Sequence, residues 1–351
     1  AAEAARRAPG AQTADALATS LTTHPDLVGF VGDTSTPRAA SGGSETAGDW
    51  PAHDPVSGLL AVPDSNAGTI RVVDVASGEV ARELPIPEAG PDDHLVSTAW
   101  TPNDLLVLIG SRSVVGIDAT TGAVRLARTE AEGTIDDAAV SADGEHLAFI
   151  SSTSSDRATV TVLPLTGDTR PVRGDVPCCP VARAIGSGRT AKLLTGTVAW
   201  KGDDLFVGSG NGTIVRWDSA TGAPLDTVAR DLGALWSMQF SDDGARLYVS
   251  GAGPSGADAD ERGALQAYDT TDWSPIWTTP QPFLGAIADD PVHDAVRVAD
   301  AFNGGTVVTL DRATGLPSGR VFPSPTGSAC AAVLSPDSRY LAYTRQLPSH
   351  L

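Results

Sequence analysis

Short apolar runs separated by polar turns recur along the chain from about residue 48 onward. Each unit consists of an apolar run, a turn that contains Asp or Pro, and a second apolar run. The seven turns are Asp54–Gly58, Thr101–Asp104, Ser141–Gly144, Lys201–Asp204, Ser241–Gly244, Asp290–Asp294 and Ser335–Ser338. Their spacing of roughly 40–60 residues is close to the length of a β-propeller blade.

The run after each turn is short, rich in aliphatic residues and bounded by turn residues, which predicts a β-strand. These runs are Leu59–Val62, Leu105–Leu108, Leu147–Ile150, Leu205–Val207, Leu247–Val249, Val296–Val298 and Leu341–Tyr343. A third run follows six of them, at Gly68–Asp74, Val114–Asp118, Ala158–Val162, Gly212–Asp218, Gly263–Asp269 and Gly305–Asp311.

Four of the third runs lead into an Asp-x-x-[Ser/Thr]-Gly turn, which ends at Gly78, Gly122, Gly222 and Gly315. The Asp side chain can accept hydrogen bonds from its own downstream amides, and Gly can adopt the positive φ that such a turn requires. A fourth, outer strand follows these turns, for example Val80–Leu84 or Val124–Ala127. Four antiparallel strands per unit are typical of a propeller blade, and stacked blades bury the faces that one blade alone would expose.

We therefore expect an all-β, seven-bladed β-propeller over residues 26–351, in preference to a β-sandwich. The last unit is incomplete, because the chain ends at Leu351 soon after the run at Leu341–Tyr343. The segment Leu27–Val31 could supply its outer strand. That still leaves this blade one strand short, so either the blade has three strands or the sequence is a piece of a longer protein; we favour the second.

Residues 1–25 differ from the rest and predict a short helical linker from an upstream domain. Ala1–Ala8 favours a helix that Pro9 ends. Thr13 can then cap a second helix, in which the apolar residues Ala14, Leu17, Ala18 and Leu21 share one face. This apolar stripe is narrow, so the helix must pack on another part of the protein.

The segments Glu3–Pro9 and Thr13–Phe30 resemble the junction that precedes WD-repeat propellers in large actinobacterial regulators. Those proteins carry a signal-transduction ATPase module, often behind a bacterial transcriptional activator domain. Residues Gly212–Asp218 followed by Thr221-Gly222 resemble a WD repeat, although only this unit has a Trp-Asp pair and no Gly-His dipeptide opens a unit. The resemblance implies that the propeller is the regulatory C-terminal domain, which holds the ATPase module inactive until a signal arrives.

The net charge is −19, from 24 Lys and Arg residues against 43 Asp and Glu residues. This argues against nucleic-acid binding by this domain, because phosphate contacts need concentrated cations. Five Asp-Asp pairs begin at Asp92, Asp136, Asp203, Asp242 and Asp289, and we interpret them as turn residues that favour solubility. No apolar stretch is long enough for a membrane span. Three Cys residues fit a reducing compartment, so we expect a cytoplasmic protein with Cys178 and Cys179 as loop thiols.

We expect no catalytic residue, metal site or cofactor, because no nucleophile triad, phosphate loop or metal-binding motif is complete. Aromatic residues at the ends of inner strands, Trp100, Trp200 and Phe240, fit packing between blades. The irregular stretch from Gly174 to Gly196 fits a rim where partners bind. The candidate partner-binding residues are Trp236, Trp273, Trp277, Arg183, Arg189 and Lys192.

The function that these observations favour is a non-catalytic platform for protein interaction and sensing. Its partner would be another protein or its own upstream ATPase module. Two alternatives stay open: a propeller hydrolase or lactonase with a metal ion in the central channel, and a secreted binding propeller.

Overall fold

The computed structural model describes residues 51–54, 56–64, 67–87, 93, 95–154, 157–167, 170–177, 196–230, 232, 235–251, 264–280, 287–300, 306–318, 328–334 and 341–346. Strands and turns make up these ranges, and none of them forms a helix, let alone one long and apolar enough to cross a membrane. The expected N-terminal helices and the segment Leu27–Val31 lie outside the described residues.

The described strands form seven antiparallel sheets, of which five have four strands, one has three and one has two. Blade 1 comprises β1 (Ala52–His53), β2 (Leu59–Asp64), β3 (Thr69–Asp74) and β4 (Val80–Pro85). Blade 2 comprises β5 (Leu95–Trp100), β6 (Leu105–Gly110), β7 (Ser113–Asp118) and β8 (Val124–Glu130). Blade 3 comprises β9 (Thr134–Val140), β10 (His146–Ser154), β11 (Arg157–Pro164) and β12 (Val172–Pro177).

Blade 4 comprises β13 (Gly196–Lys201), β14 (Asp204–Ser209), β15 (Ile214–Asp218) and β16 (Ala223–Ala229). Blade 5 comprises β17 (Leu235–Phe240), β18 (Arg246–Gly251), β19 (Ala264–Asp269) and β20 (Pro275–Thr279). Blade 6 comprises β21 (Ile287–Asp290), β22 (Ala295–Asp300) and β23 (Thr306–Asp311). The last sheet pairs β24 (Ser328–Leu334) with β25 (Leu341–Gln346).

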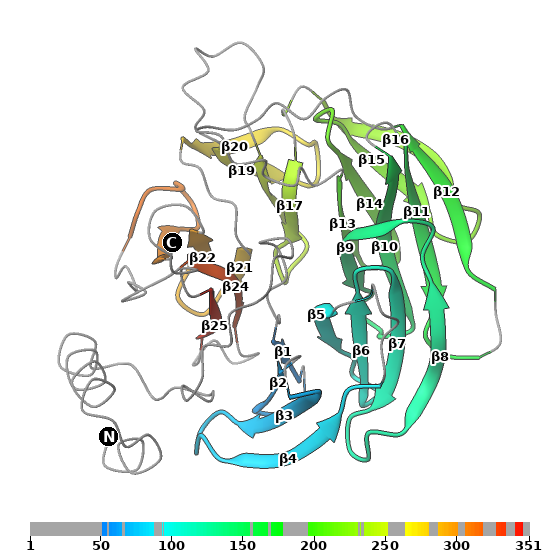
Figure 1. The fold of residues 1–351 in the computed structure, drawn as a ribbon. Helices are drawn as coiled ribbons and strands as arrows, with labels where there is room; N and C mark the ends of the chain where they lie inside the picture. Colours follow the sequence, from blue (N-terminus) through cyan, green and yellow to red (C-terminus); the bar gives the residue numbers. More distant parts are fainter. Residues whose placement is uncertain are drawn as a thin grey trace, which may run out of the picture.

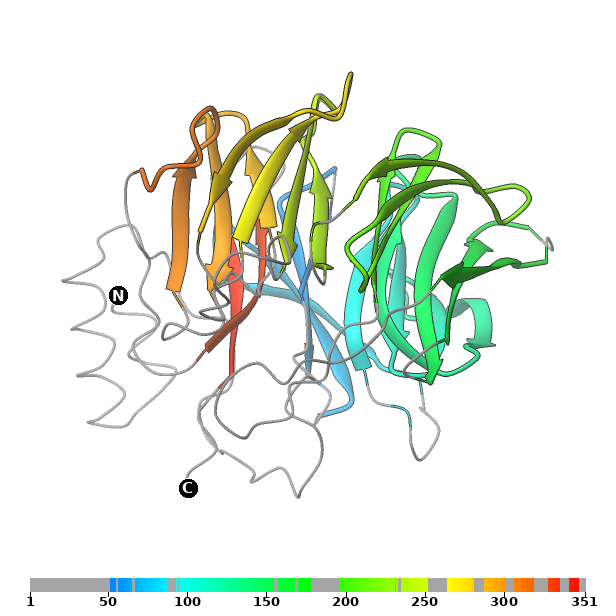
Figure 2. The ribbon, with the colours of Figure 1, turned by 90° about the horizontal axis from the view of Figure 1, so that it is seen from above.

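The sheets follow one another around a ring, as in a β-propeller (Figure 1; Figure 2 shows the same ribbon turned by 90°). The first strands of blades 3, 4 and 5 are neighbours, and β24 contacts β21, β22 and β23 on one side and β1 on the other. The two-stranded sheet therefore lies between blade 6 and blade 1. The sequence predicted seven blades; the described residues form six blades of three or four strands and this two-stranded sheet.

The strands predicted from the apolar runs are confirmed, and each blade is a meander in which consecutive strands pair. A register shift recurs where the third strand meets the fourth in blades 1, 2, 4 and 5. It lies at or close to the start of the outer strand, after the turn that opens with Asp. An extra residue at such a point increases the local twist of the outer strand.

The hydrophobic core lies between neighbouring blades. One cluster joins blades 2 and 3, where Val107 and Ile109 pack with Leu147 and Phe149. Equivalent clusters join blades 1 and 2, 3 and 4, 4 and 5, and 5 and 6. Both faces of a blade are thereby covered, which explains why second strands such as β6 are buried at every residue.

The inner-strand aromatic residues contribute to these clusters, as the sequence predicted. Trp100 is buried between blades 1 and 2, and Phe240 between blades 4 and 5. Trp200 packs against the cluster between blades 3 and 4 and donates a hydrogen bond of 2.9 Å to the carbonyl of Ala139.

In blades 2, 4 and 6 the glycine of the turn before the outer strand lies against the outer strand of the preceding blade. A Cβ atom on Gly315 of blade 6 would lie 2.4 Å from the Trp277 ring of blade 5. A Cβ atom on Gly222 of blade 4 would lie 2.6 Å from the carbonyl oxygen of Arg173 in blade 3. Glycine at these positions therefore allows close packing of blades as well as positive φ.

Blade 5 has Trp273 at this turn position instead of glycine. Trp273 has a φ of 61°, and its N–H donates to the carbonyl of Asp269 at 2.8 Å, as the glycines of the other turns do. Its ring contacts the Phe206 ring of blade 4, with 5.3 Å between the ring centroids. A tryptophan in a left-handed conformation is strained, so packing on blade 4 is what compensates for the strain.

Candidate functional site

Two sets of turns meet at one end of the ring: those between the first and second strands of a blade, and those between the third and fourth. In blade 2 the N–H of Ala119 donates to the carbonyl of Asp104 at 2.9 Å, which joins the two turns. The same bond forms in blade 6, between Arg312 and Asp294 at 3.0 Å. We call this end of the ring the turn end.

Asp side chains organise the turns at this end. In the third-to-fourth-strand turns, one carboxylate oxygen accepts backbone N–H bonds from the residues two or three positions ahead. Asp118 accepts from Thr121 N at 2.8 Å, and Asp311 accepts from Thr314 N at 2.8 Å. In the first-to-second-strand turns, Ser241 Oγ donates to Asp243 at 2.6 Å. The expectation that Asp serves turn geometry is confirmed for these residues.

The turn end is therefore strongly acidic. The acidic residues of its described turns are Asp54, Asp74, Glu79, Asp104, Asp118, Asp143, Glu145, Asp203, Asp204, Asp218, Asp242, Asp243, Asp269, Asp272, Asp290, Asp294 and Asp311. The Lys and Arg residues of the same segments are Arg170, Lys201, Arg246 and Arg312. Anions outnumber cations several-fold here, so this end of the ring repels anionic partners.

The turn hydrogen bonds hold several of these carboxylates in the charged form. Bonds from the backbone and hydroxyl of Ser77 lower the pKa of Asp74, and equivalent bonds from Thr121 lower the pKa of Asp118. The bond from Ser241 is the main reason that the pKa of Asp243 falls to about 2. The negative charge of the turn end therefore persists well below neutral pH.

Exposed apolar side chains also gather at the turn end. Seven large hydrophobic residues are exposed in the described part of the chain: Val56, Val80, Val124, Leu225, Ile276, Val292 and Leu316. Each lies in one of these turns or within the first residues that follow a third-to-fourth-strand turn. Apolar side chains at the rim of an acidic face are the kind of surface that contacts other proteins.

Two of the Asp-Asp pairs belong to inner strands, contrary to our interpretation of all five as turn residues; only Asp290, which ends its strand, also begins a turn. Asp137, in β9 of blade 3, accepts a hydrogen bond from the hydroxyl of Thr197 in blade 4 and another from Val198 N at 3.0 Å. Burial raises the pKa of Asp137 to about 6, and the hydrogen bonds from Thr197 and Val198 oppose that shift. This carboxylate joins two blades.

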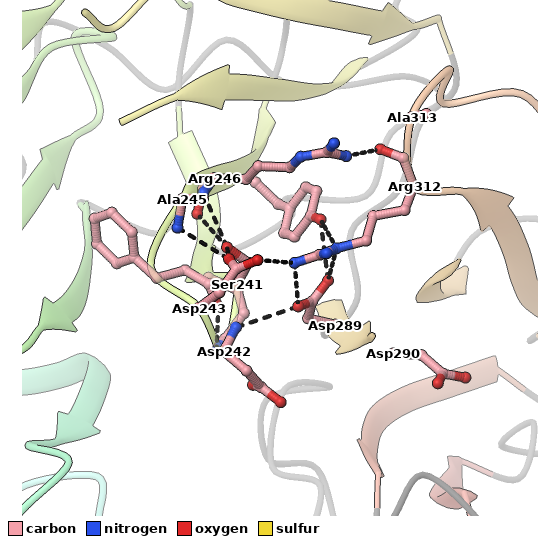
Figure 3. Close-up of polar contacts among 12 residues, drawn as sticks. Ser241, Asp242, Asp243, Ala245, Arg246, Asp289, Asp290, Arg312 and Ala313 are labelled. Atoms are coloured by element: carbon pink, nitrogen blue, oxygen red, sulfur yellow. Dashed lines mark hydrogen bonds and ion pairs between the residues drawn. The ribbon is translucent and has the colours of Figure 1, made fainter. Parts of the chain in front are cut away.

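The second such pair, Asp289-Asp290, ends β21 of blade 6. Asp289 accepts bonds from Arg312 Nε at 3.0 Å and Nη2 at 3.1 Å, and from the Tyr248 hydroxyl of blade 5 at 3.0 Å. Arg312 also donates to Asp243 of blade 5 at 3.1 Å. Figure 3 shows the Arg312 guanidinium between the two carboxylates. Asp290 instead pairs with Arg297 at 2.8 Å.

Burial and mutual charge shift the pKa values of this group. Burial and the charge of Asp289 raise the pKa of Tyr248 to about 12, so its hydroxyl stays protonated. Burial alone would lower the pKa of Arg312, but bonding to Tyr248 and the charge of Asp289 raise it overall. Tyr248 is thus neutral and Arg312 charged at physiological pH, which fits a structural link between blades 5 and 6.

Asp242, beside this group, keeps an exposed carboxylate. Its backbone N–H donates to Asp289 at 3.2 Å, while its side chain points away from Arg312 (Figure 3). Burial, and then repulsion from Asp289, raise the pKa of Asp242. Among the described residues its carboxylate has no hydrogen-bonding or ion-pair partner, so it is open to a cation from outside.

The candidate partner-binding residues from the sequence fall in different places. Trp277 is 8 % exposed, and its Nε1 donates to the carbonyl of Arg312 at 3.0 Å. It therefore packs between blades 5 and 6 and does not face solvent in this structure. Trp273 is half-buried against blade 4. Trp236 lies in β17. Arg183, Arg189, Lys192, Cys178 and Cys179 lie outside the described residues.

Nothing in the sequence marks Asp137, Asp289 or Arg312 as residues that join blades. The Asp-Asp pairs were visible, but nothing local separates a turn pair from an inner-strand pair that bonds to the next blade. In the described part of the chain, no group of three or more His, Cys, Asp or Glu residues is arranged to hold a metal ion.

A family model described as outer membrane protein assembly factor BamB, a PQQ-type repeat family, matches residues 176–329. No curated protein matches the sequence. The match to the family model covers less than half of the chain, and it supports a propeller of the PQQ or WD40-like type.

Solved structures share the fold. A chain from the crystal structure of the mitotic checkpoint complex superposes with a TM-score of 0.63 at 13 % identity, covering 91 % of this chain and 96 % of that chain. The Cps50 (Swd1) β-propeller domain of Myceliophteria thermophila gives 0.62 at 16 % identity, covering 88 % and 95 %. Hydrazine synthase of Kuenenia stuttgartiensis gives 0.63 at 14 % identity, covering 89 % and 99 %. At these identities the similarity shows the fold alone.

Proposed function

We propose that this protein is a non-catalytic platform that binds another protein through the turn end of its propeller. The observation that carries the proposal is that the acidic turns and all seven exposed large apolar side chains of the described residues share this end. A rigid ring of blades presents these groups at fixed positions. Propellers are often used as protein-interaction platforms, which supports this class of function.

A more specific form of the proposal assigns the propeller to a larger regulatory protein. The resemblance of residues 3–30 to a regulator junction suggests that the domain is the cytoplasmic regulatory part of an ATPase-type transcriptional regulator. The partner would then be its own ATPase module. In this form the propeller has seven blades, with Leu27–Val31 as the expected outer strand of the last, incomplete blade. Only the N-terminal sequence supports this assignment.

The match of residues 176–329 to the BamB family model favours a second candidate, an extracytoplasmic binding propeller. The reading frame upstream of Ala1 separates the two candidates. An ATPase module encoded there supports the regulator, and a signal sequence supports the secreted protein. Fractionation of the source cells, followed by immunoblotting of the propeller, checks the same distinction independently.

Site-specific photocrosslinking tests the platform itself. A photoreactive amino acid replaces Val56, Leu225 or Val292 at the turn end, or, at the opposite end, Arg112 in a second-to-third-strand turn or Arg157 at the start of β11. We expect discrete crosslinked protein bands in the source cells from the turn-end positions and none from the control positions. The proposal is wrong if the two sets crosslink equally or if neither set crosslinks.

A further inference from the structure

Three exposed apolar side chains of the neighbouring blades 5 and 6 lie at the turn end, on segments that hydrogen bonds join. Leu316 follows Gly315, whose carbonyl accepts a bond of 2.6 Å from Thr279 in the outer strand of blade 5, the strand that carries Ile276. The turn that carries Val292 is joined to the neighbouring turn by the bond from Arg312 N to the Asp294 carbonyl. These side chains are 38 % (Ile276), 65 % (Val292) and 64 % (Leu316) exposed.

Acidic groups surround these apolar side chains. Of the acidic residues in the described part of blades 5 and 6, all but Asp300 lie at or near the turn end: Asp242, Asp243, Asp269, Asp272, Asp289, Asp290, Asp294 and Asp311. The Arg and Lys residues of the same part are Arg246, Arg297 and Arg312. The three arginines already have partners, because Arg297 binds Asp290, Arg312 binds Asp289, and Arg246 donates to the Arg312 carbonyl.

Two of the carboxylates are available to a partner. Asp242 has no side-chain partner among the described residues and points away from the Arg312 group (Figure 3). Asp272 is exposed and accepts a bond of 2.9 Å from Ser274 N. Hydrogen bonds from Ser274 lower the pKa of Asp272, so its charge persists in mildly acidic solution.

We propose that this surface, defined by Ile276, Val292 and Leu316 with Asp242 and Asp272, binds a basic amphipathic segment of a partner protein. Apolar side chains of the segment would cover the three apolar residues, and its Lys or Arg side chains would pair with the two carboxylates. This inference rests on the proposed platform function and names the chemistry of its partner.

Charge complementarity favours a basic segment over a second copy of this chain, a nucleic acid or an anionic membrane. A second copy of the chain carries the same net charge of −19 and would bring its own acidic turns against this surface. Nucleic acids and anionic membranes are repelled for the same reason. Other sectors of the turn end fit less well. On blade 2, Val124 is followed by Arg125, which pairs with Asp118 at 3.7 Å, so that carboxylate is less available to a basic segment.

The test uses a fluorescent peptide of Lys and Leu with all Leu residues on one helical face. Two matched peptides replace Leu by Ser or Lys by Glu. Binding to the purified protein is followed by fluorescence anisotropy at low and high salt. We expect the Lys/Leu peptide to bind, the Lys/Ser peptide to bind at least about tenfold more weakly, and the Glu peptide not to bind.

Two variants locate the site. The first carries Val292→Ser, Leu316→Ser and Asp242→Asn on blades 5 and 6, and the second carries Val124→Ser and Asp104→Asn on blade 2. Thermal unfolding confirms that both are folded. We expect about a tenfold loss of affinity for the first variant and less than about a twofold change for the second.

The inference is overturned if the Lys/Leu peptide does not bind, if the Lys/Ser peptide binds equally well, or if both variants lose affinity equally. Each of these results would leave the platform function standing, provided that the turn-end positions still crosslink to a protein in cells. If crosslinking also fails, both proposals fall.

Discussion

The guanidinium of Arg312 and the carboxylate of Asp289 form a two-bond ion pair, with distances of 3.0 and 3.1 Å, inside the contact between blades 5 and 6. The Asp289 side chain is only 1 % exposed. Removing Arg312 would leave a buried charge without its partner, which typically destabilises a protein by about 3–5 kcal/mol.

We therefore expect Arg312→Met to lower the free energy of unfolding by about 3–5 kcal/mol in urea titrations. Adding Asp289→Asn should restore a large part of the loss, because the buried charge is then gone. The control is Arg216→Met, which breaks the exposed pair between Arg216 and Asp226 (2.8 Å) and should change the stability much less, because solvent screens exposed charges. Equal effects of the two single variants would contradict this account.

Asp137 gives the stability an unusual dependence on pH. Its pKa is about 6 in the folded protein against 3.8 for the ordinary group, so the folded state binds the proton more tightly. The stabilisation that protonation brings is complete below about pH 4 and is lost as the pH rises through about 6. Asp137→Asn has no such titration.

The wild type should therefore lose stability between pH 4.5 and 7.5, while Asp137→Asn does not lose this contribution. The free energy of unfolding of Asp137→Asn minus that of the wild type should rise over this range. A pKa shift of about two units limits the rise to about 3 kcal/mol. Chemical denaturation across this range measures the change. The change in this difference with pH is informative, and its value at a single pH is not. In the variant the Asn amide group faces the Ala138 N–H, which lowers the stability by a similar amount at every pH. A difference that stays constant would show that Asp137 is not charged and buried as described.

Asp243 should give the stability a pH dependence of the opposite sign to that from Asp137. Its pKa is lowered to about 2, chiefly by the bond from Ser241, so its stabilising contribution is present above about pH 4 and lost as the pH falls through about 2. We expect Asp243→Asn to be less stable than the wild type at pH 7, with the difference shrinking toward pH 2. Circular dichroism during acid titration checks this, and a difference that grows on acidification would count against it.

Two turn glycines with the same conformation allow the stability cost of backbone strain to be distinguished from the cost of disturbed packing between blades. Gly315 and Gly78 have φ values of 68° and 70°. A Cβ atom on Gly315 would meet the Trp277 ring at 2.4 Å, whereas one on Gly78 would meet nothing within 4 Å.

Gly78→Ala should cost only the left-handed strain, about 1–2 kcal/mol. Gly315→Ala should cost about 1–3 kcal/mol more, because blades 5 and 6 must move apart. Thermal and urea unfolding of the two variants provide the comparison. If both lose the same stability, the glycine is required for backbone conformation alone.

In blade 5, variants of Trp273 distinguish the cost of backbone strain from the cost of losing the packing contact with Phe206. Trp273→Ala loses the contact with Phe206 but keeps a side chain in the left-handed region. Trp273→Gly loses the contact and relieves the strain. Both variants should be less stable than the wild type, and the Gly variant should be more stable than the Ala variant by about 1 kcal/mol. An Ala variant as stable as the Gly variant would show that the left-handed conformation carries no strain.

The sequence alone determined the fold class and the individual strands of this protein. Apolar runs such as Leu105–Leu108 and turns such as Asp118–Gly122 specify their local structure, because strand burial and turn conformation depend on residues a few positions apart. The repeat of this unit was enough to predict a ring of blades. The acidic composition was also visible, as was the use of Asp in most turns.

The tertiary structure alone decided which acidic residues join blades and which face solvent. Asp137 and Thr197 are sixty positions apart in sequence, and Asp243 and Arg312 are sixty-nine apart. No local pattern distinguishes these carboxylates from their neighbours, because their partners lie on an adjacent blade. The burial of Trp277 and the exposure of Val292 and Leu316 were settled in the same way, by how neighbouring blades pack around the ring.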